Sequence, residues 1–131
     1  MLNAMATLSK PLRIAKEGMY LWRKRRLSVA FVEAKAALGE CMYGAGIDDG
    51  ELGAKISALD EQLRRTEAVG DSTQALKTGR RLLVLQLAAV ALENDGPLPG
   101  AEAEFRRAWE AQAALDRHEK GMDVRRTACL D

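Results

Sequence analysis

Apolar side chains recur along residues 10–43 at the spacing of a helix that packs against one neighbour. Steps of three and four residues alternate there, and the resulting period of about 3.5 is typical of a coiled-coil seam. No proline follows Pro11 before the glycines of residues 44–50. The apolar positions of this seam are Tyr20, Leu27, Phe31, Ala34, Leu38 and Cys41, with Lys24 at the one polar position.

A second seam of the same period begins after the glycine-rich stretch of residues 44–50. Glycine adopts the left-handed conformation that ends helices, so this stretch is predicted to be a turn. Two seams joined by a short turn predict an antiparallel helical hairpin, with helices over residues 10–43 and 50–67. The interaction seam of this hairpin is predicted to contain Leu27, Phe31, Leu38, Leu52, Ile56, Leu59 and Leu63.

Two further helices are predicted over residues 73–93 and 101–119. The first is apolar nearly all round towards its end, so it should be the most buried helix. A loop with Pro97 and Pro99 separates the two. They should close over the hairpin through Leu83, Leu87, Val90, Phe105 and Trp109.

The fold class that follows is all-α, an antiparallel, coiled-coil-like helical hairpin extended by two further helices into a small bundle. Scarce aromatic residues and abundant Ala and Leu favour helices over strands. Residues 1–120 should form a single helical domain. The polar residues 121–131 are predicted to be a flexible tail.

The charges are unevenly distributed, although the net charge is only +1. Residues 1–35 carry eight basic and two acidic side chains, whereas residues 36–75 carry three basic and eight acidic ones. The predicted hairpin would bring part of the two segments together and so account for the asymmetry within the molecule. If they do not fold together, the basic segment is open to an anionic partner.

The densest group of cations follows two aromatic residues in the first predicted helix. Tyr20 and Trp22 precede four consecutive cations, Arg23, Lys24, Arg25 and Arg26. Such a group can contact nucleic-acid phosphates or lie at an anionic membrane surface. We favour a third interpretation, in which the cations form a solvated face that pairs with the acidic second helix. No recognisable nucleic-acid-binding motif accompanies them.

The sequence predicts no catalytic residue, no metal site and no cofactor. His118 is the only histidine and has no acid–base partner in view, and the two cysteines, Cys41 and Cys129, form no metal-binding pair. No small-molecule substrate is evident. The chain is therefore predicted not to be an enzyme.

A reducing compartment is expected, because nothing in the spacing of Cys41 and Cys129 indicates a disulfide framework. The longest apolar run, residues 82–92, is shorter than the roughly 20 residues that a membrane span needs. No secretory pattern is present, so a cytoplasmic protein is predicted. The basic residues 1–26 also have the composition of a transit peptide.

Residues 37–43, the turn and residues 56–63 form the familiar pattern of a helical hairpin. Over residues 20–68 the chain resembles the helical hairpin of many small, uncharacterised bacterial proteins, some of which carry an attached zinc ribbon. This chain has no cysteine pairs for such a ribbon. The resemblance implies a hairpin architecture and no activity.

The first predicted helix has more apolar surface than the shorter second helix can cover. A further apolar set lies off the seam and indicates a different neighbour: Leu12, Ile14, Met19 and Trp22. We therefore expect a protein partner or a homodimer, and an interaction or adaptor protein that acts through helix–helix packing, for example as a structural subunit. The alternative is a protein that binds nucleic acid or an anionic membrane surface through its basic helix.

Overall fold

The computed structural model describes the backbone of residues 2–47, 50–94, 96 and 99–130, and the side chains of residues 18–121 within these ranges. Four helices make up the fold, and the described residues contain no strand. The all-α class and the packing of four helices into a small bundle are confirmed. The helices are α1 (Leu2–Gly44), α2 (Glu51–Ala68), α3 (Gln74–Glu93) and α4 (Glu102–Leu130).

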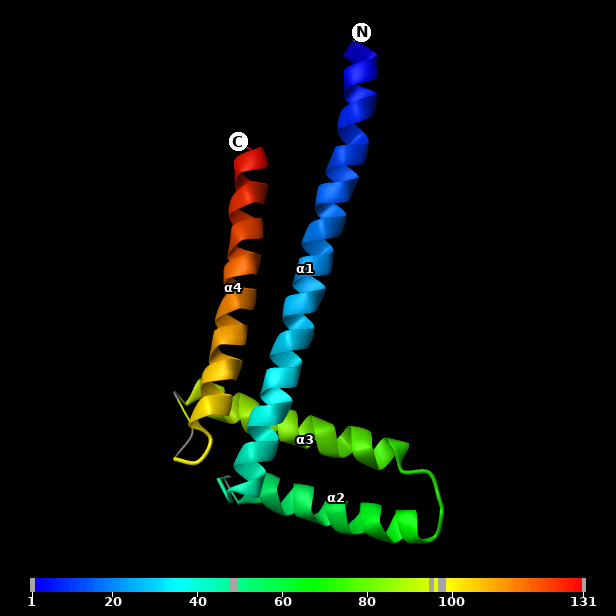
Figure 1. Cartoon of the computed structure of the whole chain (residues 1–131), viewed down its shortest axis with the longest axis vertical. Coiled ribbons are helices and arrows are strands. Elements are labelled where there is room, and N and C mark those ends of the chain that lie inside the picture. The colour runs from blue at the N-terminus through cyan, green and yellow to red at the C-terminus, as the bar shows by residue number, and fades with distance from the viewer. Residues whose placement is uncertain (1, 48–49, 95, 97–98, 131) are drawn as a thin grey trace.

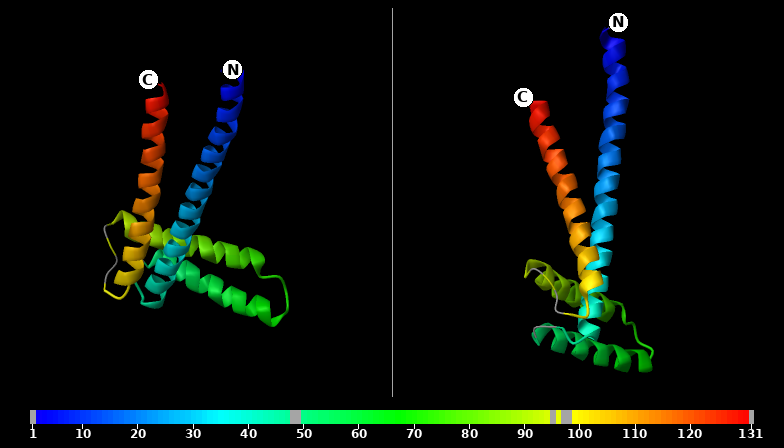
Figure 2. Two further views of the ribbon diagram at one scale, coloured as in Figure 1. Left: turned by 45° about the horizontal axis from the view of Figure 1, so that its top comes forward. Right: turned by 60° about the vertical axis from the view of Figure 1, so that its left-hand side comes forward.

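The four helices form two antiparallel pairs that cross each other. The long helices α1 and α4 run side by side in opposite directions, so both termini lie at one end of the molecule (Figure 1). The shorter helices α2 and α3 form the second pair, which lies crosswise at the other end of α1 (Figure 2). The long pair extends beyond this junction on one side only.

The predicted pairing of the first helix with the second is wrong. Helix α1 packs on α4 and α3, while α2 packs on α3 and turns away from α1 (Figure 1). A period of 3.5 shows that a helix has a neighbour but does not say which one. With 43 residues, α1 has a longer counterpart in the 29 residues of α4 than in the 18 of α2. The hairpin implied by the resemblance of residues 20–68 is therefore not formed.

The two outer helix boundaries also differ from the prediction. Helix α1 begins at Leu2 rather than near residue 10, and α4 continues to Leu130 rather than ending at residue 119. The predicted tail is thus helical from 121 to 130. A single internal Gly such as Gly121 costs only about 1 kcal/mol relative to Ala, which a long helix can absorb.

Glycine follows the end of each of the first two helices, and the turn after α1 is the one that the sequence predicts. Gly46 has a φ of 73°, and the Ile47 N–H donates to the Met42 carbonyl at 2.8 Å. Gly70 repeats the arrangement with a φ of 75°. A left-handed glycine with a six-to-one hydrogen bond is the Schellman motif, which satisfies helix-end carbonyls and turns the chain sharply.

The core lies where the two pairs of helices cross. Its largest fully buried side chains are Leu38 of α1, Ile56 of α2, and Val84 and Leu87 of α3. Ala108 is the one residue of α4 in the most buried set, and a side chain this small lets α4 approach α1 closely. The remaining buried apolar residues are Ala34, Met42, Leu52, Ala88, Ala91, Leu92, Ala101 and Ala108.

One arginine links three helices beside this core. Arg80 of α3 forms ion pairs with Glu40 of α1 and with Asp60 of α2, the latter at 2.5 Å from Nε to Oδ1. Its guanidinium also lies 5.8 Å from the centroid of the Tyr43 ring. The Glu40 carboxylate, followed by Asp60, raises the pKa of Arg80 above its ordinary value. A forked guanidinium suits this role, because it can donate to two carboxylates at once.

Gly39 is the point of closest approach between α1 and α3. A Cβ atom at this position would lie 2.2 Å from the Val84 carbonyl oxygen and 2.6 Å from Val84 Cγ1. Since these distances are far inside van der Waals contact, only glycine lets the two backbones cross here.

We predict that Gly39→Ala destabilises the protein by about 1–3 kcal/mol, because overpacking forces the crossing apart. The matched control is Gly18→Ala, at a helical position of α1 where a Cβ would meet nothing within 4 Å. Removing an internal glycine there should instead stabilise by about 0.5–1 kcal/mol. Urea unfolding followed by circular dichroism measures both, and equal effects of the two substitutions would contradict the crossing.

Candidate interaction surfaces

Most residues of the predicted interaction seam hold the chain together internally. Leu38, Leu52 and Ile56 are buried in the core. Leu59 faces α3, where its Cδ1 is the atom that a Cβ at Gly79 would meet. The other three members, Leu27, Phe31 and Leu63, are half-buried.

A different set of apolar side chains is exposed on α1. Met19 is 65% exposed, Trp22 62% and Val29 50%. Because a helix turns by about 100° per residue, these three positions share one face, roughly opposite to Leu27 and Phe31. We call Met19, Trp22 and Val29 the outer stripe. Met19 and Trp22 are the described members of the off-register set, while Leu12 and Ile14 lie where only the backbone is described.

Three arginines lie beside or within the outer stripe. Arg23, Arg25 and Arg26 are exposed, and the Arg26 guanidinium lies 5.5 Å from the centroid of the Trp22 ring. A cation over an indole face is attracted by the ring's quadrupole. Arg23 and Arg25 form no ion pair with any residue whose side chain the structure describes.

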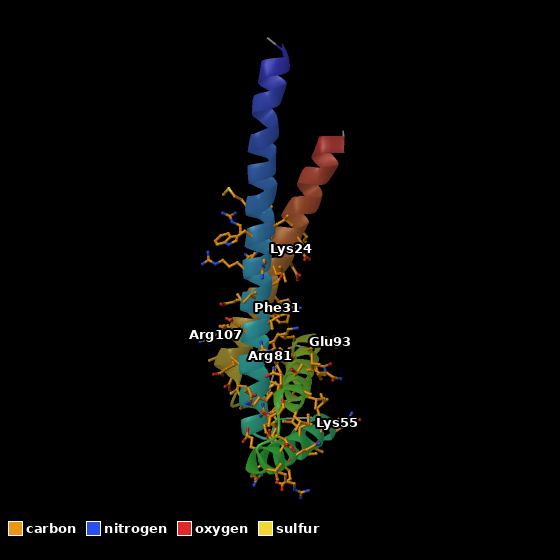
Figure 3. All side chains as sticks on the ribbon, turned by 90° about the vertical axis from the view of Figure 1, so that its right-hand side faces the viewer. Lys24, Phe31, Lys55, Arg81, Glu93 and Arg107 are labelled. Carbon is orange, nitrogen blue, oxygen red and sulfur yellow. The ribbon has the colours of Figure 1, made fainter. Side chains whose placement is uncertain are left out.

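The fourth cation of the cluster points to α4. Lys24 lies on the side of α1 that faces α4 (Figure 3), and its Nζ is 3.7 Å from Oε1 of Glu119. The expectation that the acidic second helix neutralises the cluster is wrong, because α2 lies crosswise at the far end of α1. Within α2, Glu51 and Glu61 instead pair with basic residues of their own helix.

A pocket of about 440 Å³ lies between α1, α3 and α4. Phe31 and Lys35 of α1, Glu93 of α3, and Trp109 and Asp116 of α4 line it (Figure 3 labels Phe31 and Glu93). The Lys35 ammonium lies 4.6 Å from the centroid of the Phe31 ring. Trp109, expected to close the bundle, is 44% exposed and stacks on Phe105 with the ring centroids 5.7 Å apart. The pocket therefore has an aromatic wall and charges of both signs.

The only histidine lies between the two long helices. The His118 ring is 5.7 Å from the Tyr20 ring, and its Nε2 is buried without a hydrogen-bond partner among the described residues. His118 would lie at the end of the helix predicted over residues 101–119, but α4 continues well past it to Leu130.

Cys41 is a free, half-buried thiol near the C-terminal end of α1, close to the residues that precede α4. Its Sγ donates to the Gly100 carbonyl at 3.4 Å. Burial and then the neighbouring Glu104 carboxylate raise the pKa of the Cys41 thiol above its ordinary value. Cys129 lies where only the backbone is described.

Among the described residues, no helix is long and apolar enough to cross a membrane, and no cluster of His, Cys, Asp and Glu could hold a metal ion. Comparison with known proteins adds no relative. No family model, no curated protein and no solved structure matches this chain.

We predict that Cys41 reacts slowly with iodoacetamide at neutral pH, since the thiolate is the nucleophile and a raised pKa keeps the thiol protonated. The rate, measured by mass spectrometry in a Cys129→Ser background, should rise only at a higher pH than for a cysteine in an unfolded peptide. Glu104→Gln removes a negative charge and should move the profile to lower pH. A profile unchanged by this substitution would contradict the role of Glu104.

Proposed function

We propose that this protein is a non-enzymatic helical interaction protein that binds a protein partner through the outer stripe of α1. The observation that carries the proposal is that three large apolar side chains on one helix face are at least half exposed. Single exposed apolar residues are ordinary on protein surfaces, whereas an aligned group is typical of a binding site. The cytoplasm remains the proposed setting, which suits a free thiol at Cys41.

The architecture supports this proposal. Helices α3 and α4 pack on α1, and α2 packs on α3 (Figure 1). Met19, Trp22 and Val29 nevertheless stay at least half exposed, so none of the other three helices covers the outer stripe. The spacing of Met19, Trp22 and Val29 by three and seven residues also matches the contact positions of paired helices. A helix from a partner is the element that fits such a stripe.

A second candidate function is binding of an anionic polymer through Arg23, Arg25 and Arg26. It is favoured by the position of α2, which leaves these arginines without the acidic neighbour expected from the sequence. Arg23 and Arg25 lie on opposite sides of the outer stripe, however, because a helix turns by about 100° per residue, so the three arginines do not form one continuous basic surface. For this reason we favour protein binding through the apolar stripe over binding of an anionic polymer.

The proposed function is tested with Trp22→Asp, which places a charge in the outer stripe. The immobilised variant should lose a protein that the unchanged chain retains from a cell extract. Leu82→Asp on α3 is the matched control, because Leu82 is also 62% exposed. Each substitution should change stability by no more than about 0.5 kcal/mol, as is usual at exposed sites. If the Trp22 variant retains the same proteins as the control, the proposal fails.

The second candidate is tested by changing Arg23, Lys24, Arg25 and Arg26 together to Gln. The fold should survive, because Lys24–Glu119, the ion pair that these four residues form with described side chains, is exposed, and such pairs contribute about 0–1 kcal/mol. We expect no loss of affinity for an oligonucleotide or for anionic vesicles, because we expect little binding beforehand. Salt-dependent binding that the variant abolishes at unchanged helicity would instead establish the second candidate.

A further inference from the structure

The outer stripe has the layout of one side of a two-stranded coiled coil. Met19 and Arg26 occupy one set of contact positions and Trp22 and Val29 the other, because the steps between them are three, four and three residues. In this register Arg23 and Arg25 take the two flanking positions, from which side chains reach across to a partner helix. Both flanks of the stripe at Trp22 are thus basic.

The charge of these flanks selects the partner. Opposite charges across flanking positions attract and like charges repel, and such pairs set which helices associate. Arg26 adds a third cation within the stripe itself, held over the Trp22 ring. A helix with acidic flanks would neutralise all three, whereas a basic helix would meet three like charges.

A second copy of this chain fits the surface poorly. In a symmetric antiparallel pair, the same patch on both copies meets itself. The midpoint between Trp22 and Val29 falls at residues 25 and 26, so Arg25 and Arg26 would face the same two arginines of the other copy. The predicted homodimer is therefore less favourable at this surface than a pair with a different, acidic chain.

A lipid surface also fits less well than a helix. Interfacial helices present a broad apolar face with cations at its edges. Here Arg26 lies between Met19 and Trp22 on the helix surface, and Glu33 follows in the same line, so the apolar stripe is narrow and interrupted. A narrow stripe suits a single helix lying along it.

We infer that the outer stripe binds an acidic amphipathic helix, with apolar residues against Met19, Trp22 and Val29 and carboxylates against Arg23, Arg25 and Arg26. The inference rests on the proposed function and adds the chemistry of the partner. It commits to a negatively charged protein segment rather than to a membrane or a nucleic acid.

The test uses two synthetic helical peptides with the same leucines at the contact positions and either Glu or Lys at all flanking positions. The Glu peptide should bind the full chain at least tenfold more tightly than the Lys peptide by fluorescence anisotropy, and added salt should narrow the difference. Changing Arg23 and Arg25 together to Glu should reverse the preference. Arg81→Glu is the matched control, since Arg81 is an exposed arginine of α3 (Figure 3), and should leave the preference intact.

The outcomes separate the inference from the proposed function. Equal binding of both peptides, lost in Trp22→Asp, overturns the acidic preference while the stripe remains a protein-binding surface. Binding of neither peptide, or preference for the Lys peptide, overturns the inference. Binding to vesicles of phosphatidylcholine and phosphatidylserine or to a DNA duplex, lost in the Arg23 and Arg25 double variant without any peptide binding, overturns it in favour of an anionic polymer.

Discussion

The close crossing of α1 and α3 at Gly39 is the constraint on which the rest of the structure depends. Because Gly39 has no Cβ, the Val84 backbone can lie against α1 at a distance that no other residue allows. The crossing brings Val84 and Leu87 against Leu38 and so forms the centre of the core. It also directs α3, and with it α2, across α1 rather than along it (Figure 2). The rest of α1, beyond this crossing, packs against α4.

Arg80 stabilises the same crossing from its edge. It joins Glu40 and Asp60, which come from the two helices that flank α3, so the orientation of α2 is coupled to that of α1. The side chain of Arg80 is only 21% exposed, and these pairs are therefore screened less by solvent than the ion pairs within α2. A pair of carboxylates left without this guanidinium would repel each other across the junction.

The sequence predicts the number of helices and the glycine turn after the first helix, because the hydrophobic period and helix-ending glycines are local signals. It does not predict the pairing of the helices. The apolar seam of α1 could pack against any apolar helix. The feature that favours a crossing over a hairpin is the missing Cβ at Gly39, and the spacing of apolar residues does not reveal it. Gly39 lies within the pattern of residues 37–43, and a glycine inside a helix can indicate that another helix approaches closely there.

The sequence predicts part of the candidate surface, because the register of apolar residues is a local signal. Met19 and Trp22 break the register of the seam, and this break correctly indicates a separate face. Val29 lies seven residues from Trp22, its nearest neighbour in the stripe, so the pattern does not predict that it belongs there. The role of the cations could not be predicted from the sequence alone. Opposite net charges of two adjacent segments suggested internal neutralisation, but the direction of α2 decides whether they meet.

Magnitudes indicate why both apolar and charged contacts are needed at this surface. Burying a large apolar side chain contributes about 1.5–3 kcal/mol, so Met19, Trp22 and Val29, already partly covered, contribute at most a few kcal/mol in total. Loss of translational and rotational freedom on association costs about 4–15 kcal/mol. The apolar stripe alone would therefore bind weakly and to almost any apolar helix. Attraction to Arg23, Arg25 and Arg26 accelerates encounter and rejects basic helices, so the charges supply the selectivity that three apolar side chains cannot.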